Sequence, residues 1–339
     1  MKLEQMMLLH NLYKMYKGKD YEYNTLKNNE IFLSYPSTFN DPFDCFISIV
    51  KEEFERVFLK LKLPNDKYNE INKYVNEVSF KWMRFFEHEK YLTPFIPFPS
   101  CPPTIESPET DRLENECWGL YEEYYKELIR IRDQYGIVCF TKNKPENNMV
   151  MWAHYADNYH GFCGEYVFSN PSDLCSEQRR DKKLYNLLLN MGKVRYRNKT
   201  ISVDCEKLLK IPVKDLSVNP YIKKYIKTIM FTKNIQWGYE KEYRLVLKKD
   251  DCKIANENNN GFSISFPYLQ KIFIKRDEKQ FSRNCAVDLL AKELHIDRDY
   301  LVQSNEWIEL ETDEETTIKN MINIHKQYKT PSNVEDIPF

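Results

Sequence analysis

The sequence predicts an α+β fold with a mixed or antiparallel central sheet, flanking helices and a helical insertion. Short strand patterns and helix patterns alternate irregularly after residue 136, whereas a doubly wound sheet repeats them regularly. Before that point, residues 46–135 show apolar residues at helical spacing together with a cluster of prolines. Glycine is scarce, with 8 in 339 residues, and no phosphate-binding glycine motif occurs. This excludes P-loop NTPases, typical dinucleotide-binding Rossmann enzymes and protein kinases.

The chain up to residue 90 is expected to contain four helices and one strand. The helices are expected at 3–16, 21–29, 46–63 and 66–90, and the strand at 30–34. A turn at Pro36 follows the strand, and Pro64 separates the last two helices, because proline interrupts both kinds of element.

A proline-rich stretch follows between residues 93 and 108. Its six prolines cannot lie inside a helix or a central strand, so we expect an irregular excursion there. Ser107 and Pro108 then match an N-cap with proline at the first helical position. They predict a helix that continues to about Gln134 and ends before Gly136.

The remainder of the chain is rich in predicted strands. They are expected at 136–141, 162–168, 193–197, 240–248, 262–266, 271–274 and 300–303. Helices are expected between them, at 146–157, 171–191, 214–232 and 279–294.

We expect a single α+β domain over residues 1–311, with 46–135 as its helical, proline-rich insertion, and an acidic, weakly ordered tail at 312–339. No stretch approaches the roughly 18 apolar residues of a membrane span, and polar residues interrupt the N-terminal run Leu3–Tyr13. The expected location is therefore cytoplasmic, with no membrane partner. The nine cysteines are scattered and include no C-x-x-C pair, so neither a disulfide framework nor a metal site is predicted.

The net charge of −1 hides an uneven distribution along the chain. Residues 179–249 contain 19 Lys and Arg against 6 Asp and Glu, a local charge of +13, so the remainder has −14. Within this segment, cations alternate with aromatic residues at Arg195-Tyr196-Arg197 and again near Lys223. Such a pattern suits phosphate contact combined with base stacking, and predicts a face that binds anions.

Three motifs contain the candidate functional residues. In the first, Ser34 ends a predicted strand, and Asn40 and Asp41 follow in an aromatic loop with two prolines. Short polar side chains in such a loop bond neighbouring backbone N–H groups. Two interpretations remain open: a rigid turn anchored by aromatic rings, or a loop whose polar groups line a ligand cleft.

The second motif surrounds His154. If this segment is helical, Trp152 and Tyr155 share one face, and His154 and Asp157 lie three residues apart on an adjacent face. A histidine with a carboxylate partner can act as a general base or donate to a phosphate. The alternative is that His154 caps the helix or borders the core.

The third motif contains Glu240, Glu242 and Arg244, which would point to one face of a strand. Three successive charges are costly to bury, so this face is expected to meet solvent or a ligand. The plain interpretation is a solvated face with one ion pair. The functional interpretation is that a carboxylate pair beside a guanidinium holds ribose hydroxyls and stabilises an oxocarbenium-like centre.

Together these motifs resemble the bacterial domain-of-unknown-function family 2971. Matching blocks occur, in order, at Tyr13-Lys14, Phe39–Asp44, Met151–Cys163 and Trp237–Arg244, and the resemblance spans roughly residues 12–290. The chain departs from the family pattern at two places. Met15-Tyr16-Lys17 follows Lys14 where members usually continue to an Arg, and Lys275 stands where members tend to have Gly. The family has no settled activity, so the resemblance alone implies no reaction.

A basic and aromatic opening, a strand that ends in Ser and a late Glu-x-Glu are also similar, in this order, to ADP-ribosyltransferases, which bind NAD without a glycine-rich loop. This similarity implies an ADP-ribosyltransferase-like fold and an ADP-ribosyl-transferring or NAD-cleaving enzyme, with NAD as co-substrate. The chain would then be expected to act as an effector in phage defence or in a toxin system. The residues that it implies as catalytic are Glu242, Glu240 and His154, and those that it implies as NAD-binding are Ser34, Asn40, Asp41, Trp152, Tyr155, Lys233 and Arg244.

Two other functions remain open from the residues alone. One is a nucleic-acid-directed protein, either a metal-dependent nuclease or an RNA binder, that uses residues 179–249. A nuclease would need Asp41 or Asp44 near the two glutamates. The other is a non-catalytic sensor or interaction module, with an unspecified protein partner, whose polar motifs only fix loops. The three functions differ in whether the motifs meet in one pocket.

Overall fold

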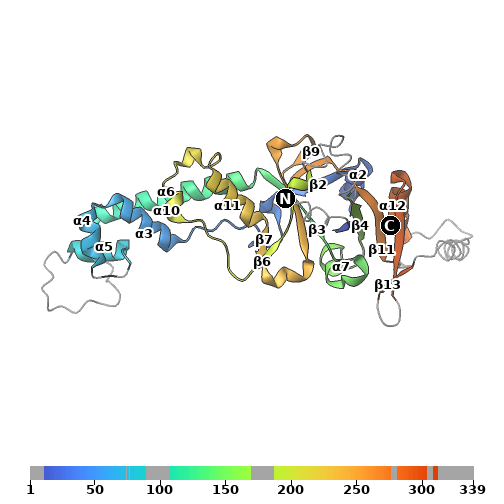
Figure 1. Ribbon diagram of the computed structural model, residues 1–339, viewed down its shortest axis with the longest axis horizontal. Helices are drawn as coiled ribbons and strands as arrows, with labels where there is room; N and C mark the ends of the chain where they lie inside the picture. The colour runs from blue at the N-terminus through green and yellow to red at the C-terminus, as the bar shows by residue number, and fades with distance from the viewer. Residues whose placement is uncertain are drawn as a thin grey trace, which may run out of the picture.

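The computed structural model describes residues 11–73, 75, 77–88, 107–168, 187–275, 281–303 and 308–311. Over these residues the fold is α+β, as predicted. A large mixed sheet occupies one end of the molecule and a helical arm extends from it (Figure 1). The arm comes from the chain between strands β2 (Glu30–Ser34) and β3 (Tyr135–Thr141), where the helical insertion was expected.

Eleven of the described strands form one large sheet. Nine of them follow the order β13-β12-β11-β4-β1-β3-β2-β10-β9, and β8 and β5 extend the sheet from β3. The remaining bounds are β1 Asn11–Tyr16, β4 Phe162–Val167, β5 Met191–Lys193, β8 Glu242–Lys248, β9 Ile254–Asn258, β10 Gly261–Ser265, β11 Leu269–Lys275, β12 Asp297–Gln303 and β13 Ile308–Glu311. Within this sheet β11 and β12 pair in parallel and the other described pairs are antiparallel, so the sheet is mixed.

Strand β3 is the point where the sheet branches. One of its edges pairs with β8 along its whole length, from Tyr135 opposite Lys248 to Thr141 opposite Glu242. The other edge is shared by β1 and β2. A separate two-stranded sheet pairs β6 (Arg195–Arg197) with β7 (Thr232–Asn234) in parallel.

The arm contains helices α3 (Lys51–Lys62), α4 (Asn65–Asn72), α5 (Phe80–His88) and α6 (Pro108–Arg132). The predicted start of α6 is confirmed, because Ser107 Oγ accepts a hydrogen bond from Thr110 N at 3.4 Å and Pro108 is the first helical residue. Phe54, Phe58, Leu128 and their neighbours form a core that reaches Ile137 of β3. The arm therefore shares its core with the sheet.

Five further described helices come from other parts of the chain: α2 (Asp20–Lys27), α7 (Met149–Tyr155), α10 (Cys205–Leu208), α11 (Pro220–Met230) and α12 (Phe281–Leu294). Of these, α10 and α11 pack against the arm (Figure 1). In α11 the buried residues Ile222, Tyr225, Ile226, Ile229 and Met230 recur at helical spacing and pack into the arm's core. The lysines of α11 are left on its outer face.

Several predicted elements differ from the structure. Residues 11–16 form strand β1 and not a helix, because both of its faces are buried: Leu12 and Tyr16 belong to one core, and Tyr13 and Met15 to another. A central strand that is buried on both sides loses the alternation that would identify it.

Other differences concern element boundaries. The helix expected at 66–90 is two helices, α4 and α5, and the helix expected at 46–63 begins at Lys51. The strand expected at 193–197 is divided between β5 and β6, which belong to different sheets. The strand expected from residue 240 begins at Glu242, because Lys241 has a left-handed backbone with φ of 45°.

Some predicted segments lie outside the described residues: 3–10, most of the proline-rich stretch, most of the helix at 171–191, and the tail at 312–339. Among the helices that the structure describes, none is both long and apolar enough to cross a membrane.

Candidate functional site

Five charged side chains meet inside the protein between β8, β7 and the loop after β2. We call Asp44, Lys233, Glu240, Glu242 and Arg244 the buried charge cluster; each is at most 8% exposed. Charged groups are rarely buried unless they are paired, so their mutual contacts decide whether this cluster stabilises the fold.

Arg244 lies at the centre of the buried charge cluster and is 0% exposed. Its Nη1 and Nη2 donate to the two carboxylate oxygens of Asp44 at 2.9 and 2.6 Å. Its Nε and Nη2 donate to the two oxygens of Glu242 at 2.6 and 3.2 Å. Nη1 also donates to the carbonyl of Met230, the last residue of α11, at 2.9 Å. Such fork-like pairs are the strongest geometry available to a guanidinium.

Lys233 joins the second glutamate to the cluster. Its Nζ donates to Glu240 Oε2 at 2.6 Å and to Glu242 Oε2 at 3.3 Å, and lies 3.7 Å from Asp44 Oδ2. Tyr155 of α7 completes the arrangement, because its hydroxyl donates to Glu240 Oε1 at 2.6 Å. All four carboxylate oxygens of the two glutamates therefore already accept hydrogen bonds.

The titration of the two glutamates differs because their partners differ. Burial alone would raise the pKa of Glu242, but the charges of Arg244 and Lys233 outweigh it and lower this pKa to about 2. Burial raises the pKa of Glu240 above its ordinary value, since Lys233 and Tyr155 compensate it only in part. For Lys233, burial lowers the pKa, but the surrounding carboxylates raise it overall.

The expectation that Glu240, Glu242 and Arg244 face solvent or a ligand is wrong. Lys241 turns the chain before β8 begins, so Glu240 lies outside the strand and reaches the cluster from a 3₁₀ turn. Asp44 and Lys233 come from other elements and supply the opposite charges that make burial tolerable. The third motif begins at Lys233, but its spacing does not reveal that Lys233 pairs with both glutamates, and it gives no information on Asp44.

The three motifs do meet, largely through the predicted residues. Asp44 shares Arg244 with Glu242, so it also lies beside the glutamates, as the nuclease interpretation required. Asp44 represents the first motif, Tyr155 the second, and the two glutamates with Arg244 the third. Asp41, by contrast, accepts a hydrogen bond from the backbone N–H of Phe43 at 2.9 Å. This contact is the one that the rigid-turn interpretation predicts. Asn40 is exposed in the same loop, and Ser34 pairs with Gly261 and Ile137 within the sheet.

His154 and Trp152 have different surroundings from those expected of an NAD site. Trp152 is fully buried, donates from Nε1 to the carbonyl of Pro145 at 2.9 Å and stacks on Tyr159. It is therefore a core residue and not a surface for stacking a ligand. His154 is exposed, and its Nδ1 lies 3.1 Å from the hydroxyl of Tyr239. Asp157 has a left-handed backbone at the end of α7 and pairs with Lys19 at 3.8 Å.

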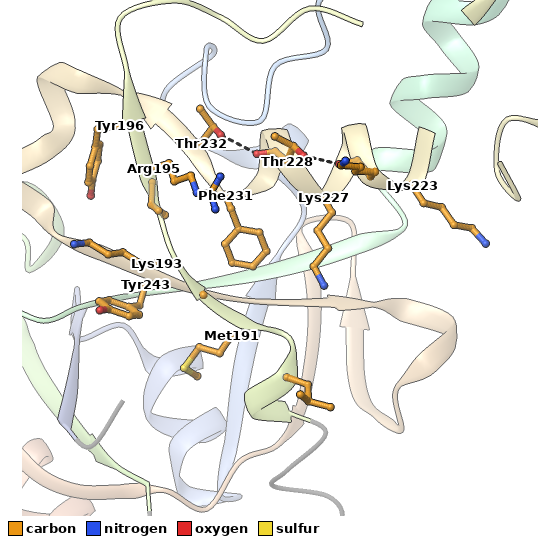
Figure 2. A pocket seen from close by; sticks show the side chains of 14 residues that line it. Met191, Lys193, Arg195, Tyr196, Lys223, Lys227, Thr228, Phe231, Thr232 and Tyr243 are labelled. Carbon is orange, nitrogen blue, oxygen red and sulfur yellow. Dashed lines mark hydrogen bonds between the residues drawn. The ribbon is translucent and has the colours of Figure 1, made fainter. Parts of the chain in front are cut away.

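A second feature is a cleft lined by residues of β5, β6, β7, β8 and α11, which we call the basic cleft (Figure 2). Its volume is about 1050 Å³. Its cations are Lys193 of β5, Arg195 of β6 and three lysines of α11: Lys223, Lys224 and Lys227. Tyr196, Phe231 and Tyr243 add aromatic rings, and no acidic residue is among the described residues that line it.

The cations of the basic cleft are exposed and spread along it. Figure 2 shows Lys193 at one end, Lys223 at the other, and the ring of Phe231 between Lys193 and Lys227. Within the described part of the chain, none of the five cations has a salt bridge to an acidic side chain. Lys223 and Lys227 are also one turn apart on α11, where like charges repel. Anions in solution are the natural partners of such a surface.

The buried charge cluster positions the walls of the basic cleft. Arg244 holds the last carbonyl of α11, the helix that supplies the three lysines. The backbone N–H of Glu242 donates to the hydroxyl of Tyr196 at 2.8 Å, and burial raises the pKa of Tyr196 to about 12. Lys233 lies on β7, the strand that pairs with β6. Three elements that line the cleft are thus fastened to one cluster.

A neighbouring cavity of about 620 Å³ extends the basic surface. It shares Lys223 and Lys227 with the basic cleft and adds Lys248 and Lys253 beside Asp251. No group of three or more His, Cys, Asp or Glu side chains arranged to hold a metal ion occurs among the described residues.

Sequence reasoning identified Arg195, Tyr196 and Lys223 as residues suited to phosphate, but missed Phe231 and Tyr243. The available signal was the amphipathic pattern of residues 220–230, whose polar face consists largely of lysine. No signal in the sequence indicated Tyr243, because only the pairing between β5 and β8 places it opposite Lys193.

Comparison with known families confirms the resemblance to family 2971 over part of the predicted span, for the last two of the four blocks. The model of DUF2971, described as a protein of unknown function, matches residues 151–245. That range contains the second and third motifs, the basic cleft's cations, and four of the five members of the buried charge cluster. No curated protein and no solved structure matches the chain.

Proposed function

We propose that this DUF2971 chain binds nucleic acid in the basic cleft and that the buried charge cluster is the scaffold of that site. The observation that supports this most directly is the exposed row of five cations without acidic partners among the described residues. Proteins that bind single strands without strong sequence preference combine a positive groove with aromatic rings on which bases stack. Tyr196, Phe231 and Tyr243 supply such rings among the cations.

An extended polyanion fits the basic cleft better than a single phosphate group does. The cations are distributed over β5, β6 and α11 and do not converge on one point (Figure 2). The neighbouring cavity continues the positive surface through Lys223 and Lys227 towards Lys253, whereas Lys248 in that cavity is paired with Asp250 at 2.9 Å. A polymer with regularly spaced phosphates can neutralise all of these charges together.

ADP-ribosyl transfer has less support from the same geometry. A catalytic glutamate must approach the reacting ribose, yet Glu242 is 3% exposed and both of its oxygens bind Arg244. Trp152, implied as an NAD-stacking residue, is fully buried. The ADP-ribosyl-transferring function therefore stays a prediction from resemblance.

The test is a titration of labelled single-stranded RNA and DNA of about twenty nucleotides with the whole protein at several salt concentrations. If all five cations contact phosphates, the logarithm of the binding constant should fall with the logarithm of salt concentration with a slope of about −3.5. Fluorescence anisotropy measures it. Weak binding with a flat salt dependence would contradict the proposal.

The matched control is a lysine outside the cleft. Lys214 is exposed on a 3₁₀ turn and lines none of the described cavities. Lys214→Gln should leave both the affinity and the slope unchanged. Lys227→Gln removes the same charge from the cleft and should weaken binding and make the slope shallower by about 0.7.

A further inference from the structure

A smaller cavity lies at the end of the row of cations and is not part of the basic cleft. Its volume is about 280 Å³, and it shares only Thr232 with the cleft among their described lining residues. Arg197 and Lys199 stand at its wall, and Phe43, Phe46 and Ile201 give it apolar surface. No acidic residue is among the described residues that line it.

A series of exposed cations connects the two cavities. Lys193 ends β5, Arg195 and Arg197 lie on β6, and Lys199 follows in a bend. Alternate residues of one strand, such as Arg195 and Arg197, lie on one side about 6.6 Å apart. The first two cations line the basic cleft and the last two line the small cavity. A phosphate backbone that follows this row passes from one cavity to the other.

The apolar part of the small cavity has an exposed aromatic ring. Phe43 is 72% exposed, and its ring centre lies 6.3 Å from that of Phe46 at an angle of 59°. A large apolar ring in water beside two cations has the composition of a base-stacking platform, since every base has a π-face and every nucleotide a phosphate. A cavity of this volume is at the lower limit of small-ligand sites, which suits one base and not a base pair.

We infer that the bound nucleic acid is single-stranded, and that it runs from the basic cleft along β6 to the small cavity, where one unpaired base stacks on Phe43. The inference rests on the proposed function and makes it more specific. In this arrangement Arg197 and Lys199 contact the phosphates that flank the stacked base. A duplex cannot place a base in the cavity without first losing a base pair.

The experiment compares a single strand with a duplex of the same sequence, using the whole protein and the variants Phe43→Ala and Phe43→Trp. The wild-type protein should bind the single strand more tightly than the duplex. Phe43→Ala should weaken single-strand binding at least about fivefold without changing the salt slope, because stacking releases no counterions. Phe43→Trp retains a stacking ring and should restore binding. Leu61→Ala, which removes an exposed apolar side chain from α3, is the control.

The outcomes separate this inference from the proposed function. Equal affinity for the two probes, or unchanged single-strand affinity in Phe43→Ala, would overturn the stacking site while leaving nucleic-acid binding in place. Failure of the wild-type protein to bind either probe would overturn the proposed function, and the inference with it. A second variant, Arg197→Gln, should reduce the salt slope by about 0.7 and a slope equal to that of the wild type would contradict the path along β6.

Discussion

The buried charge cluster and the basic cleft lie on neighbouring sides of the same strands, yet they use charge in opposite ways. In the cluster, two cations and three carboxylates are buried and bond one another. In the cleft, five cations are exposed and have no acidic partner among the described residues. The carboxylate pair Glu240 and Glu242 is thus a structural element here, and the lysines of α11 are the candidates for binding.

The two regions differ in where their counter-charges come from. Both regions belong to the positive segment 179–249, apart from Asp44. The residue types and the net charge of this segment therefore do not distinguish the buried charge cluster from the basic cleft. What distinguishes them is whether the protein itself supplies the counter-charge, and only the folded structure reveals that.

Loss of Arg244 should produce the largest effect on folding. Arg244→Ala leaves Asp44 and Glu242 buried without their main partner and frees the end of α11. We expect the free energy of unfolding to fall by about 3–5 kcal/mol, measured by urea denaturation. A fall of less than about 0.5 kcal/mol, the size of a typical surface change, would show that the cluster is not a scaffold.

The second-largest effect on folding is expected from acidification, which should remove the stabilising contribution of Glu242. The pKa of Glu242 is lowered from 4.5 to about 2 in the folded protein, so its contribution is complete above pH 4.5 and is lost as the pH falls towards 2. A difference of 2.5 pKa units corresponds to about 3 kcal/mol. Glu240 acts in the opposite direction, since its raised pKa means that protonation favours the folded state.

The measurement is the free energy of unfolding of the wild-type protein and of Glu242→Gln over this pH range. The variant cannot lose a charge at this position, so its stability should decline less steeply with acidification. Parallel curves for the two proteins would mean that Glu242 titrates as an ordinary surface carboxylate, contrary to its burial.

Much of the fold could be predicted from the sequence where one face of an element is exposed. The start of α6 followed from Ser107 and Pro108, and α11 from its alternation of apolar residues and lysines. Strand β1 could not be identified, because Leu12 and Tyr13 are both buried, in different cores. Hydrophobic periodicity arises from the alternation of buried and exposed positions. It therefore cannot identify an element that has no exposed face.

The site could be predicted only in part, for a related reason. Residues of all three motifs meet in the structure, but their contacts join positions that are far apart in the sequence. Asp44 and Arg244 are 200 residues apart, and Tyr155 and Glu240 are 85 apart. Spacing within a motif gives the direction of a side chain on a strand or helix, and gives no information on what lies opposite it.

The smallest effect on folding should come from the basic cleft. Lys223→Gln combined with Lys227→Gln removes two exposed charges that repel each other, so stability should change by no more than about 0.5 kcal/mol. The same double variant should bind nucleic acid markedly less well. Arg244→Ala, by contrast, should lower the free energy of unfolding. The two variants therefore distinguish residues proposed to bind nucleic acid from residues that stabilise the fold.

The most direct test of the central claim is the salt dependence of single-strand binding by this Lys223→Gln, Lys227→Gln double variant beside the wild-type protein. If both lysines neutralise phosphates, the slope of log binding constant against log salt should become shallower by about 1.4 while the free energy of unfolding changes by no more than about 0.5 kcal/mol. The same slope and the same affinity in both proteins would contradict the assignment of the basic cleft as the nucleic-acid site.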